Sequence, residues 1–139
     1  AAFNPDLITY KIGANDFTGT PDATYRTNLI NLRAAYASAR PAAKVAWSPP
    51  IAYNPTGTPH GSKAYFDTQR ASLLAQCRDP AVWGQWADYY MPIGEHPDFG
   101  DASKAAPLFG DSVHPSAEGQ ALLATVFTAF MDTLLNASR

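Results

Sequence analysis

Segments typical of strands and segments typical of helices alternate along this sequence, and the alternation limits the fold more than any other feature. Three short segments rich in β-branched and aromatic residues, 6–12, 44–48 and 87–91, predict strands. Apolar residues recur at helical spacing over about 21–39, 62–78 and 116–135, which predicts three main helices. A chain that repeats strand and helix in this order favours a parallel sheet with helical crossovers. The predicted fold class is therefore α/β.

The apolar positions of these helices also predict the core. The first helix has one stripe, the second has a shorter inward face, and the third carries a broad apolar face. Those positions are, in order, Tyr25, Leu29, Leu32 and Tyr36; Tyr65 or Phe66, Leu73 and Cys77; Leu123, Val126, Phe127, Phe130 and Leu134. Ser116 is the predicted N-cap of the last helix.

The length of 139 residues fits a single domain over 1–139. The first strand is rich in Ile and Leu, as is typical of a strand buried on both faces of a parallel sheet. Such a strand close to residue 1 suggests that sheet partners precede it and are missing from this chain. Because the sequence starts at Ala1 rather than Met, we expect that its start was produced by processing, by proteolysis or by the design of the expressed sequence.

Composition excludes several classes of function. Hydrophobic residues make up 46% and charged residues 16% of the chain, and the formal net charge is -2. No basic stripe is present, so nucleic acid is not an expected partner. No apolar run approaches the roughly 20 residues needed to cross a bilayer. Cys77 is the only cysteine, which rules out a disulfide within the chain and leaves the compartment open; its apolar neighbours predict a buried thiol.

Binding sites of parallel α/β sheets lie beyond the carboxyl ends of the strands. Two polar motifs are expected in that region. Gly13-Ala-Asn15-Asp16 comes directly after the first strand. Asp111-Ser-Val-His114-Pro115 closes a long Gly- and Pro-rich segment, 92–113, that we expect to be an irregular loop.

Asp111 and His114 are three residues apart, and in a helical turn this spacing places both side chains on one face. A carboxylate that accepts from one imidazole nitrogen fixes the tautomer and stabilises the imidazolium. The pair could therefore act as an oriented general base. The alternative is an Asp that caps the turn beside an exposed His.

Asn15 could direct its amide N–H groups at a developing oxyanion. Gly13 would permit a tight turn or the close approach of a substrate, and Asp16 would hydrogen-bond local amides. The alternative is an ordinary Asn-Asp turn.

Taken together, the two motifs resemble the SGNH (GDSL-type) hydrolase family. "PDLITYKIGANDF" is similar to the third sequence block of that family and "GDSVHPSAEGQALLA" to the fifth. The resemblance covers essentially the whole chain, as the C-terminal half to two-thirds of a typical domain. It implies a flavodoxin-like three-layer α/β/α fold and an ester hydrolase, such as a lipase, thioesterase or acetylesterase, that needs no cofactor or metal. The resemblance also slightly favours a secreted or extracytoplasmic location.

The resemblance also implies residue roles. Asn15 corresponds to the oxyanion-hole asparagine, His114 to the general base and Asp111 to its orienting carboxylate. Gly13 and Asp16 correspond to the turn-forming members of the third block. Tyr53, which follows the carboxyl end of the second strand, is a candidate for shaping the substrate pocket.

The nucleophile is where the match fails. The family carries a Gly-Asp-Ser block and an oxyanion-hole glycine ahead of its third block, and only twelve residues precede Gly13 here. The favoured explanation is a partner polypeptide from the N-terminal part of the same domain that supplies the serine. The alternatives are an inactive binding or assembly module, and a rearranged site that uses Ser112 of Gly110-Asp111-Ser112.

Two further groups of polar and aromatic residues have simpler interpretations. The spacing of His60, His96, Asp98 and Asp101 fits no standard set of metal ligands, although either His could line a substrate entrance. Four aromatic residues near the third strand could stack on sugars but are more typical of a core; they are Trp83, Trp86, Tyr89 and Tyr90.

Overall fold

A parallel three-stranded sheet forms the centre of the computed structural model, which describes residues 5–12, 22–52, 54–55, 63–111 and 114–137. The strands are β1 (Leu7–Lys11), β2 (Lys44–Ser48) and β3 (Tyr89–Tyr90), in the order β1-β2-β3. Leu7 pairs with Lys44 and Ala46 pairs with Tyr89. The expected parallel α/β sheet is therefore confirmed.

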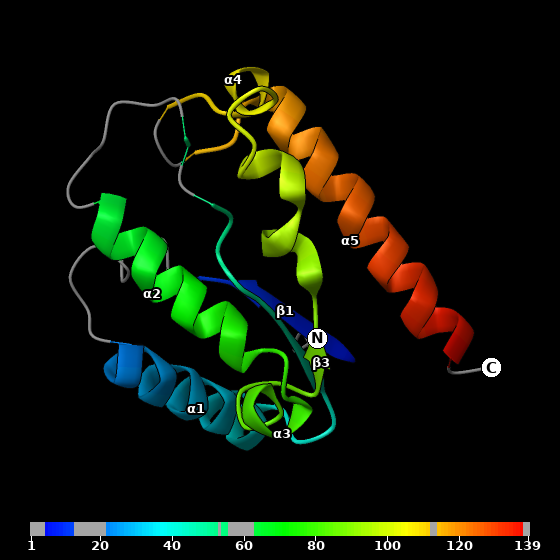
Figure 1. The fold of residues 1–139 in the computed structure, drawn as a ribbon. Helices are drawn as coiled ribbons and strands as arrows, with labels where there is room; N and C mark the ends of the chain where they lie inside the picture. Colours follow the sequence, from blue (N-terminus) through cyan, green and yellow to red (C-terminus); the bar gives the residue numbers. More distant parts are fainter. Residues whose placement is uncertain (1–4, 13–21, 53, 56–62, 112–113, 138–139) are drawn as a thin grey trace.

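Helices lie on both sides of this sheet (Figure 1). The helices α1 (Asp22–Ala39) and α2 (Lys63–Gln76) lie on one side, and α5 (Ala117–Ala137) lies on the other. Short helices fill the connections: α3 (Pro80–Trp83), η2 (Pro92–Glu95), η3 (Pro97–Phe99) and α4 (Ala105–Leu108). None of the helices in the described ranges has the length and apolar character needed to cross a membrane.

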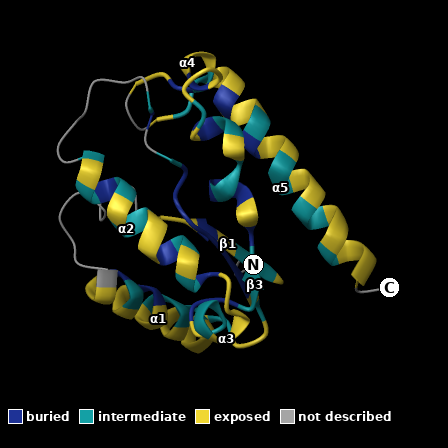
Figure 2. Cartoon of the chain, viewed as in Figure 1, coloured by how far each residue is buried: buried dark blue, intermediate teal, exposed yellow. Residues whose placement is uncertain are grey.

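The core is divided by the sheet into two clusters, as a three-layer arrangement requires. Val45 and Trp47 of β2 belong to the cluster under α1 and α2, which includes Leu29 and Leu73. Ala46, between them, belongs to the cluster under α5. Figure 2 shows buried residues gathered on the strands and on the helix sides that face them. Successive residues of β2 thus point to opposite faces, and both faces are buried.

The predicted core positions are largely confirmed. Phe66, Leu73 and Cys77 of the second helical segment are buried, and so are Tyr25 and Leu29 of the first. Leu32 and Tyr36 pack against the same cluster but are only partly buried. Of the predicted face of α5, Leu123 is the position that is buried. Val126, Phe130 and Leu134 border an open groove of about 530 Å³ that also contacts Trp83, Tyr89 and Tyr90, and Phe127 borders a second groove beside Thr9 and Lys11.

Two expectations differ from the structure. The segment 92–113, predicted as an irregular loop, contains η2, η3 and α4 before its last residues. Pro92 and Pro97 occupy first helical positions, where the fixed φ of proline suits a helix start. The first strand was expected to be buried on both faces, but Thr9 and Lys11 are exposed, because they border an open groove beside α5.

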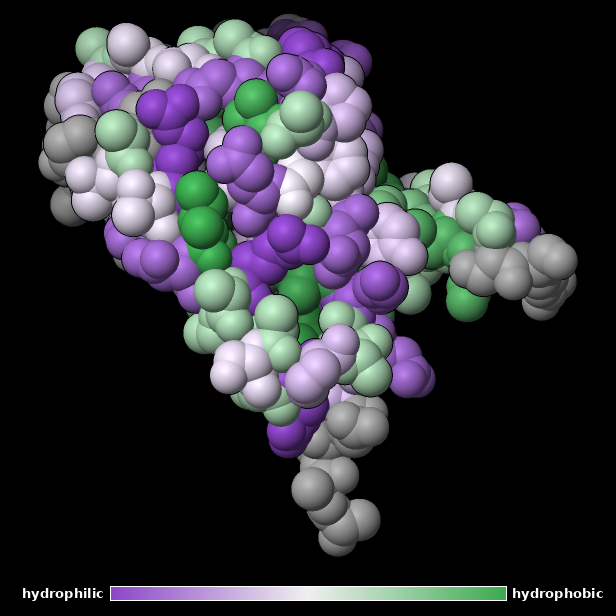
Figure 3. Space-filling model, turned by 90° about the horizontal axis from the view of Figure 1, so that it is seen from below, coloured by the Kyte–Doolittle hydropathy of each residue, from purple (hydrophilic) through white to green (hydrophobic). Residues whose placement is uncertain are grey.

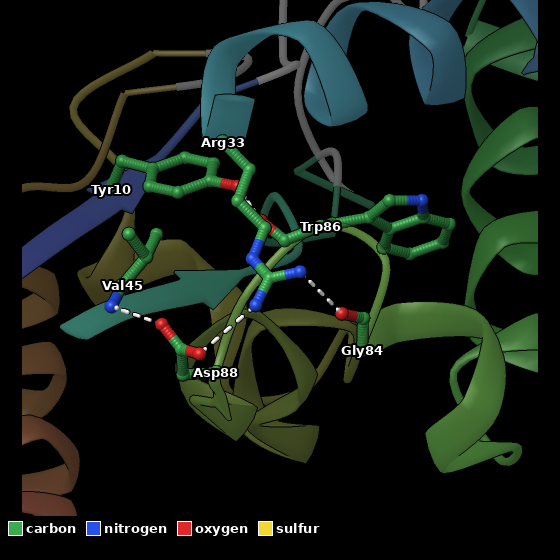
Figure 4. A network of polar contacts seen from close by, with 6 residues as sticks. All are labelled: Tyr10, Arg33, Val45, Gly84, Trp86 and Asp88. Carbon is green, nitrogen blue, oxygen red and sulfur yellow. Dashed lines mark hydrogen bonds and ion pairs between the residues drawn. The ribbon is translucent and has the colours of Figure 1, made fainter. Parts of the chain in front are cut away.

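A polar network ties the layers together at the amino ends of the strands (Figure 4). The Asp88 carboxylate accepts from Val45 N at 2.9 Å and from Arg33 Nη2 at 3.0 Å. Arg33 also donates to Gly84 O at 2.9 Å. The outer surface of α1 and α3, seen from below in Figure 3, mixes polar residues with small separate apolar patches.

Candidate active site

The structure brings Asp111 and His114 into direct contact. His114 Nδ1 lies 2.7 Å from Asp111 Oδ2, and His114 N donates to Asp111 Oδ1 at 2.7 Å. The residues form a bend rather than the helical turn that the spacing suggested. One carboxylate thus caps a main-chain amide and also holds the imidazole, which combines the two alternatives drawn from the sequence.

This geometry determines which ring nitrogen is available for chemistry. A carboxylate beside Nδ1 favours the tautomer that carries its proton there. Nε2 is then the nitrogen that can take a proton from a reacting group and return it. Both side chains are open to solvent, with 78% of His114 and 55% of Asp111 exposed.

The pair lies at a corner that joins α4 to α5 (Figure 1). Gly110 N donates to His114 O at 2.8 Å, and Phe109 pairs with Pro115 in an antiparallel bridge. Phe109 is buried and meets Phe99 edge to face at a ring distance of 5.5 Å. The two ends of the corner are therefore joined to each other, and Phe109 anchors them in the core.

The start of α5 holds the other end of that corner. Ser116 Oγ accepts from Gly119 N at 3.1 Å, which confirms the predicted N-cap. Ser116 N donates to Leu108 O at 2.9 Å. A side chain at Gly119 would place its Cβ 2.1 Å from Leu108 O, so only glycine lets α5 pass this close to α4.

A residue that sequence reasoning missed contacts this corner from elsewhere in the chain. The Asn54 side chain donates from Nδ2 to Asp111 O at 3.1 Å, and Asn54 is 7% exposed. Its position beyond the carboxyl end of β2 was the one feature that could have indicated a place near the site. In the sequence, however, it is one more polar residue of a Pro-rich loop.

The remaining predicted site residues, Gly13, Asn15, Asp16 and Tyr53, lie outside the described residues, as do Ser112 and His60. Their predicted roles therefore stay predictions.

Other polar residues near the site serve local turns. His96 Nδ1 accepts from Asp98 N at 3.4 Å, and Asp98 pairs with Lys104 at 2.7 Å. Asp101 Oδ1 accepts from Ser103 N at 2.8 Å. Within the described part of the chain, no three His, Cys, Asp or Glu side chains come together as a metal site would require.

The aromatic residues near β3 pack in the core or at its border. Trp86 is 1% exposed and meets Trp47 edge to face at 5.1 Å. Trp83 and Tyr90 are partly buried against the same cluster. Their positions match the core interpretation, and Tyr90 also donates to Glu95.

The α/β fold has three layers, and an Asp–His pair lies beyond the carboxyl ends of its strands. This combination is typical of α/β hydrolytic enzymes. Comparison with known proteins narrows that class. A model of the GDSL-like lipase/acylhydrolase family matches residues 1–122, so the chain belongs to this family.

The fold has a relative of known structure. The crystal structure of a protein assigned as a GDSL-like lipase from Parabacteroides merdae ATCC 43184 superposes with a TM-score of 0.68 and 21% identity. The alignment covers 90% of this chain and 59% of that protein, so the chain spans less than two thirds of its relative's length. A search among curated proteins found no match.

Proposed function

We propose that the protein hydrolyses carboxylic esters by acyl transfer to a serine, with His114 as general base and Asp111 as its orienting carboxylate. Membership of the GDSL-like family supports an acylhydrolase in general terms. The observation that carries the finer proposal is the 2.7 Å contact between His114 Nδ1 and Asp111 Oδ2. That contact leaves Nε2 as the nitrogen that exchanges protons.

The proposed reaction has two acyl-transfer steps. The serine Oγ attacks the ester carbonyl carbon while its proton moves to His114 Nε2. The carbonyl oxygen becomes an oxyanion, which the Asn15 amide stabilises. The C–O bond then breaks and the alcohol leaves with the proton from His114. Water repeats the sequence on the acyl-enzyme and releases the carboxylic acid.

In this proposal the serine belongs to an N-terminal segment or chain of the same domain that the 139 residues do not include. Gly13 and Asp16 shape the turn that presents Asn15, and Tyr53 borders the substrate pocket. The reaction needs no metal and no organic cofactor, because the serine, imidazole and amide supply the nucleophile, base and oxyanion donor.

The test is labelling of the full protein with a fluorophosphonate, followed by intact mass measurement under denaturing conditions. We expect the label on a serine outside these 139 residues. A label on Ser112 would replace the proposed nucleophile with a local one. No label at all would favour the competing function, an inactive binding or assembly module.

A variant pair tests the role of His114. We expect His114→Ala to reduce ester hydrolysis by roughly six orders of magnitude in kcat, as loss of a triad member does in serine hydrolases. Lys104→Ala, which removes an exposed ion pair with Asp98, is the control and should keep its activity. Substantial turnover by His114→Ala would rule out this assignment.

A further inference from the structure

Asn54 is a buried polar residue that contacts the Asp–His pair from a distant part of the chain. It is 57 residues from Asp111, and its Nδ2 lies 3.1 Å from the Asp111 carbonyl oxygen. Buried amide side chains in native proteins are hydrogen-bonded, and a bond to a main-chain carbonyl fixes the local backbone. Asn54 is thus a direct link between the loop after β2 and the corner that carries the pair.

The segment that leads to Asn54 is firmly held. Ile51 is 5% exposed and belongs to the core cluster that also contains Phe109. Arg70 reaches across from α2 and donates to Pro50 O at 3.0 Å and to Gly94 O at 2.6 Å. Pro50 and Ile51, which precede Asn54 in the chain, are therefore held by α2 and by the core, and the same arginine joins them to the segment after β3.

The Asp111 side of the contact is arranged so that the two roles do not compete. The carboxylate oxygens are both used by His114, through its main-chain N and through Nδ1. Asn54 uses the main-chain carbonyl instead. The amide can therefore hold the Asp111 backbone without taking an acceptor away from the imidazole.

Solvent exposure makes such a hold important for the pair. With more than half of each side chain exposed, water competes for the contact between Asp111 and His114. A displacement of about 1 Å in a catalytic group can reduce the rate about 100-fold.

We propose that Asn54 is a positioning residue, which holds the Asp111 backbone so that its carboxylate presents His114 to the reacting atoms. The inference rests on the proposed function for its effect on catalysis. Its structural part, the dependence of the His114–Asp111 geometry on Asn54, does not require that the protein be an esterase.

The test compares three forms of the full protein: wild type, Asn54→Ala and Arg33→Met. Arg33→Met is a matched control, because it removes hydrogen bonds to Gly84 and Asp88 at the other end of the sheet. We expect kcat to fall about 10- to 100-fold in Asn54→Ala with KM little changed. The control should lose stability and keep its kcat.

A second measurement follows His114 itself by NMR of the imidazole nitrogens and the Nδ1 proton. We expect the hydrogen-bonded Nδ1 proton signal of the wild type to weaken and shift in Asn54→Ala but not in Arg33→Met. If Asn54→Ala does not fold, Asn54→Asp, which keeps the size and removes the donor, replaces it. An unchanged His114 spectrum, or the same kcat loss in the control, would overturn the proposal.

The two measurements separate the two proposals. If the wild type hydrolyses no ester and labels no serine, the proposed function fails, and the NMR comparison still decides whether Asn54 holds the pair. If the wild type is an esterase and the Asn54 variants keep both its kcat and the His114 signals, only the positioning role fails.

Discussion

The carboxylate of Asp111 shows how one side chain can order a whole turn. Each oxygen lies 2.7 Å from a nitrogen of His114, one in the main chain and one in the ring. The main-chain bond fixes where residue 114 lies, and the ring bond fixes how the imidazole is turned. Each bond uses one carboxylate oxygen as its acceptor. An amide keeps one oxygen and replaces the other with an NH₂ group, so it could preserve the main-chain bond while losing the bond to the ring.

This division of roles gives a prediction at the residue scale. We expect Asp111→Asn to keep the turn, because the amide oxygen can still accept from His114 N. Its NH₂ group would face Nδ1 and favour the wrong tautomer, so kcat should fall by about four orders of magnitude. The measurement is kcat for ester hydrolysis beside the thermal unfolding midpoint.

Asp101→Asn is the control for that prediction. Asp101 is also an acceptor in a local turn, where it bonds to Ser103, but it does not contact the imidazole. This variant should keep its activity. Near wild-type activity in Asp111→Asn would contradict the orienting role of the carboxylate.

At the scale of elements, a glycine allows the segments after β2 and β3 to approach each other closely. Gly94 in η2 lies against the residues after β2, and a Cβ there would be 1.8 Å from Pro49 O. Gly94 N donates to the buried Ser48 Oγ at 3.1 Å, and Gly94 O accepts from Arg70. The segments after β2 and β3 therefore pack backbone to backbone.

We expect Gly94→Ala to reduce the free energy of unfolding by about 3 kcal/mol or more, because backbone atoms must move to admit the methyl group. Gly100→Ala is the matched control. Gly100 is exposed, and its added Cβ would lie 3.6 Å from Pro97 O, an ordinary contact.

Urea unfolding of both variants measures the difference. The control should stay within about 0.5 kcal/mol of the wild type. Equal stabilities for the two variants would show that the loops after β2 and β3 are not packed as described.

At the scale of the whole molecule, Asp88 joins α1, β2 and the segment before β3 (Figure 4). Burial raises the pKa of its carboxyl group, but hydrogen bonds from Val45 N and Arg33 and the charges of Arg33 and Lys44 outweigh this effect. The pKa of Asp88 is therefore lowered below its ordinary value of 3.8.

A lowered pKa in the folded state means that the ionised carboxylate stabilises the fold above the unfolded-state pKa, and that this contribution is lost as the pH falls through the folded-state pKa. We therefore expect Asp88→Asn to reduce the unfolding free energy most near neutral pH. The difference from the wild type should shrink steadily as the pH falls below 3.8.

Urea unfolding at a series of pH values measures that difference. In an Arg33→Met background the effect of Asp88→Asn should be smaller at neutral pH, because the main ion-pair partner is gone. A difference that does not change with pH would contradict a role for the carboxylate charge.

The features that the sequence determined are those set by neighbouring residues. Hydrophobic periodicity gave the order of strands and helices, and a spacing of three residues brought Asp111 to His114. β2 was predicted at 44–48 and observed there, and the cap at Ser116 was found because caps act within one turn. Such features depend on the geometry of residues close together in the sequence, which is the same whatever the rest of the fold.

Tertiary structure alone decided the contacts that fix the site in space. The hydrogen bond of Asn54 to Asp111 joins residues 57 apart, and Arg70 reaches the loops after both β2 and β3. The exposure of Thr9 and Lys11 is likewise decided by packing, because both residues border an open groove beside α5. These contacts arise because packing the layers brings loop ends together, and loop ends have no periodicity from which their neighbours could be read.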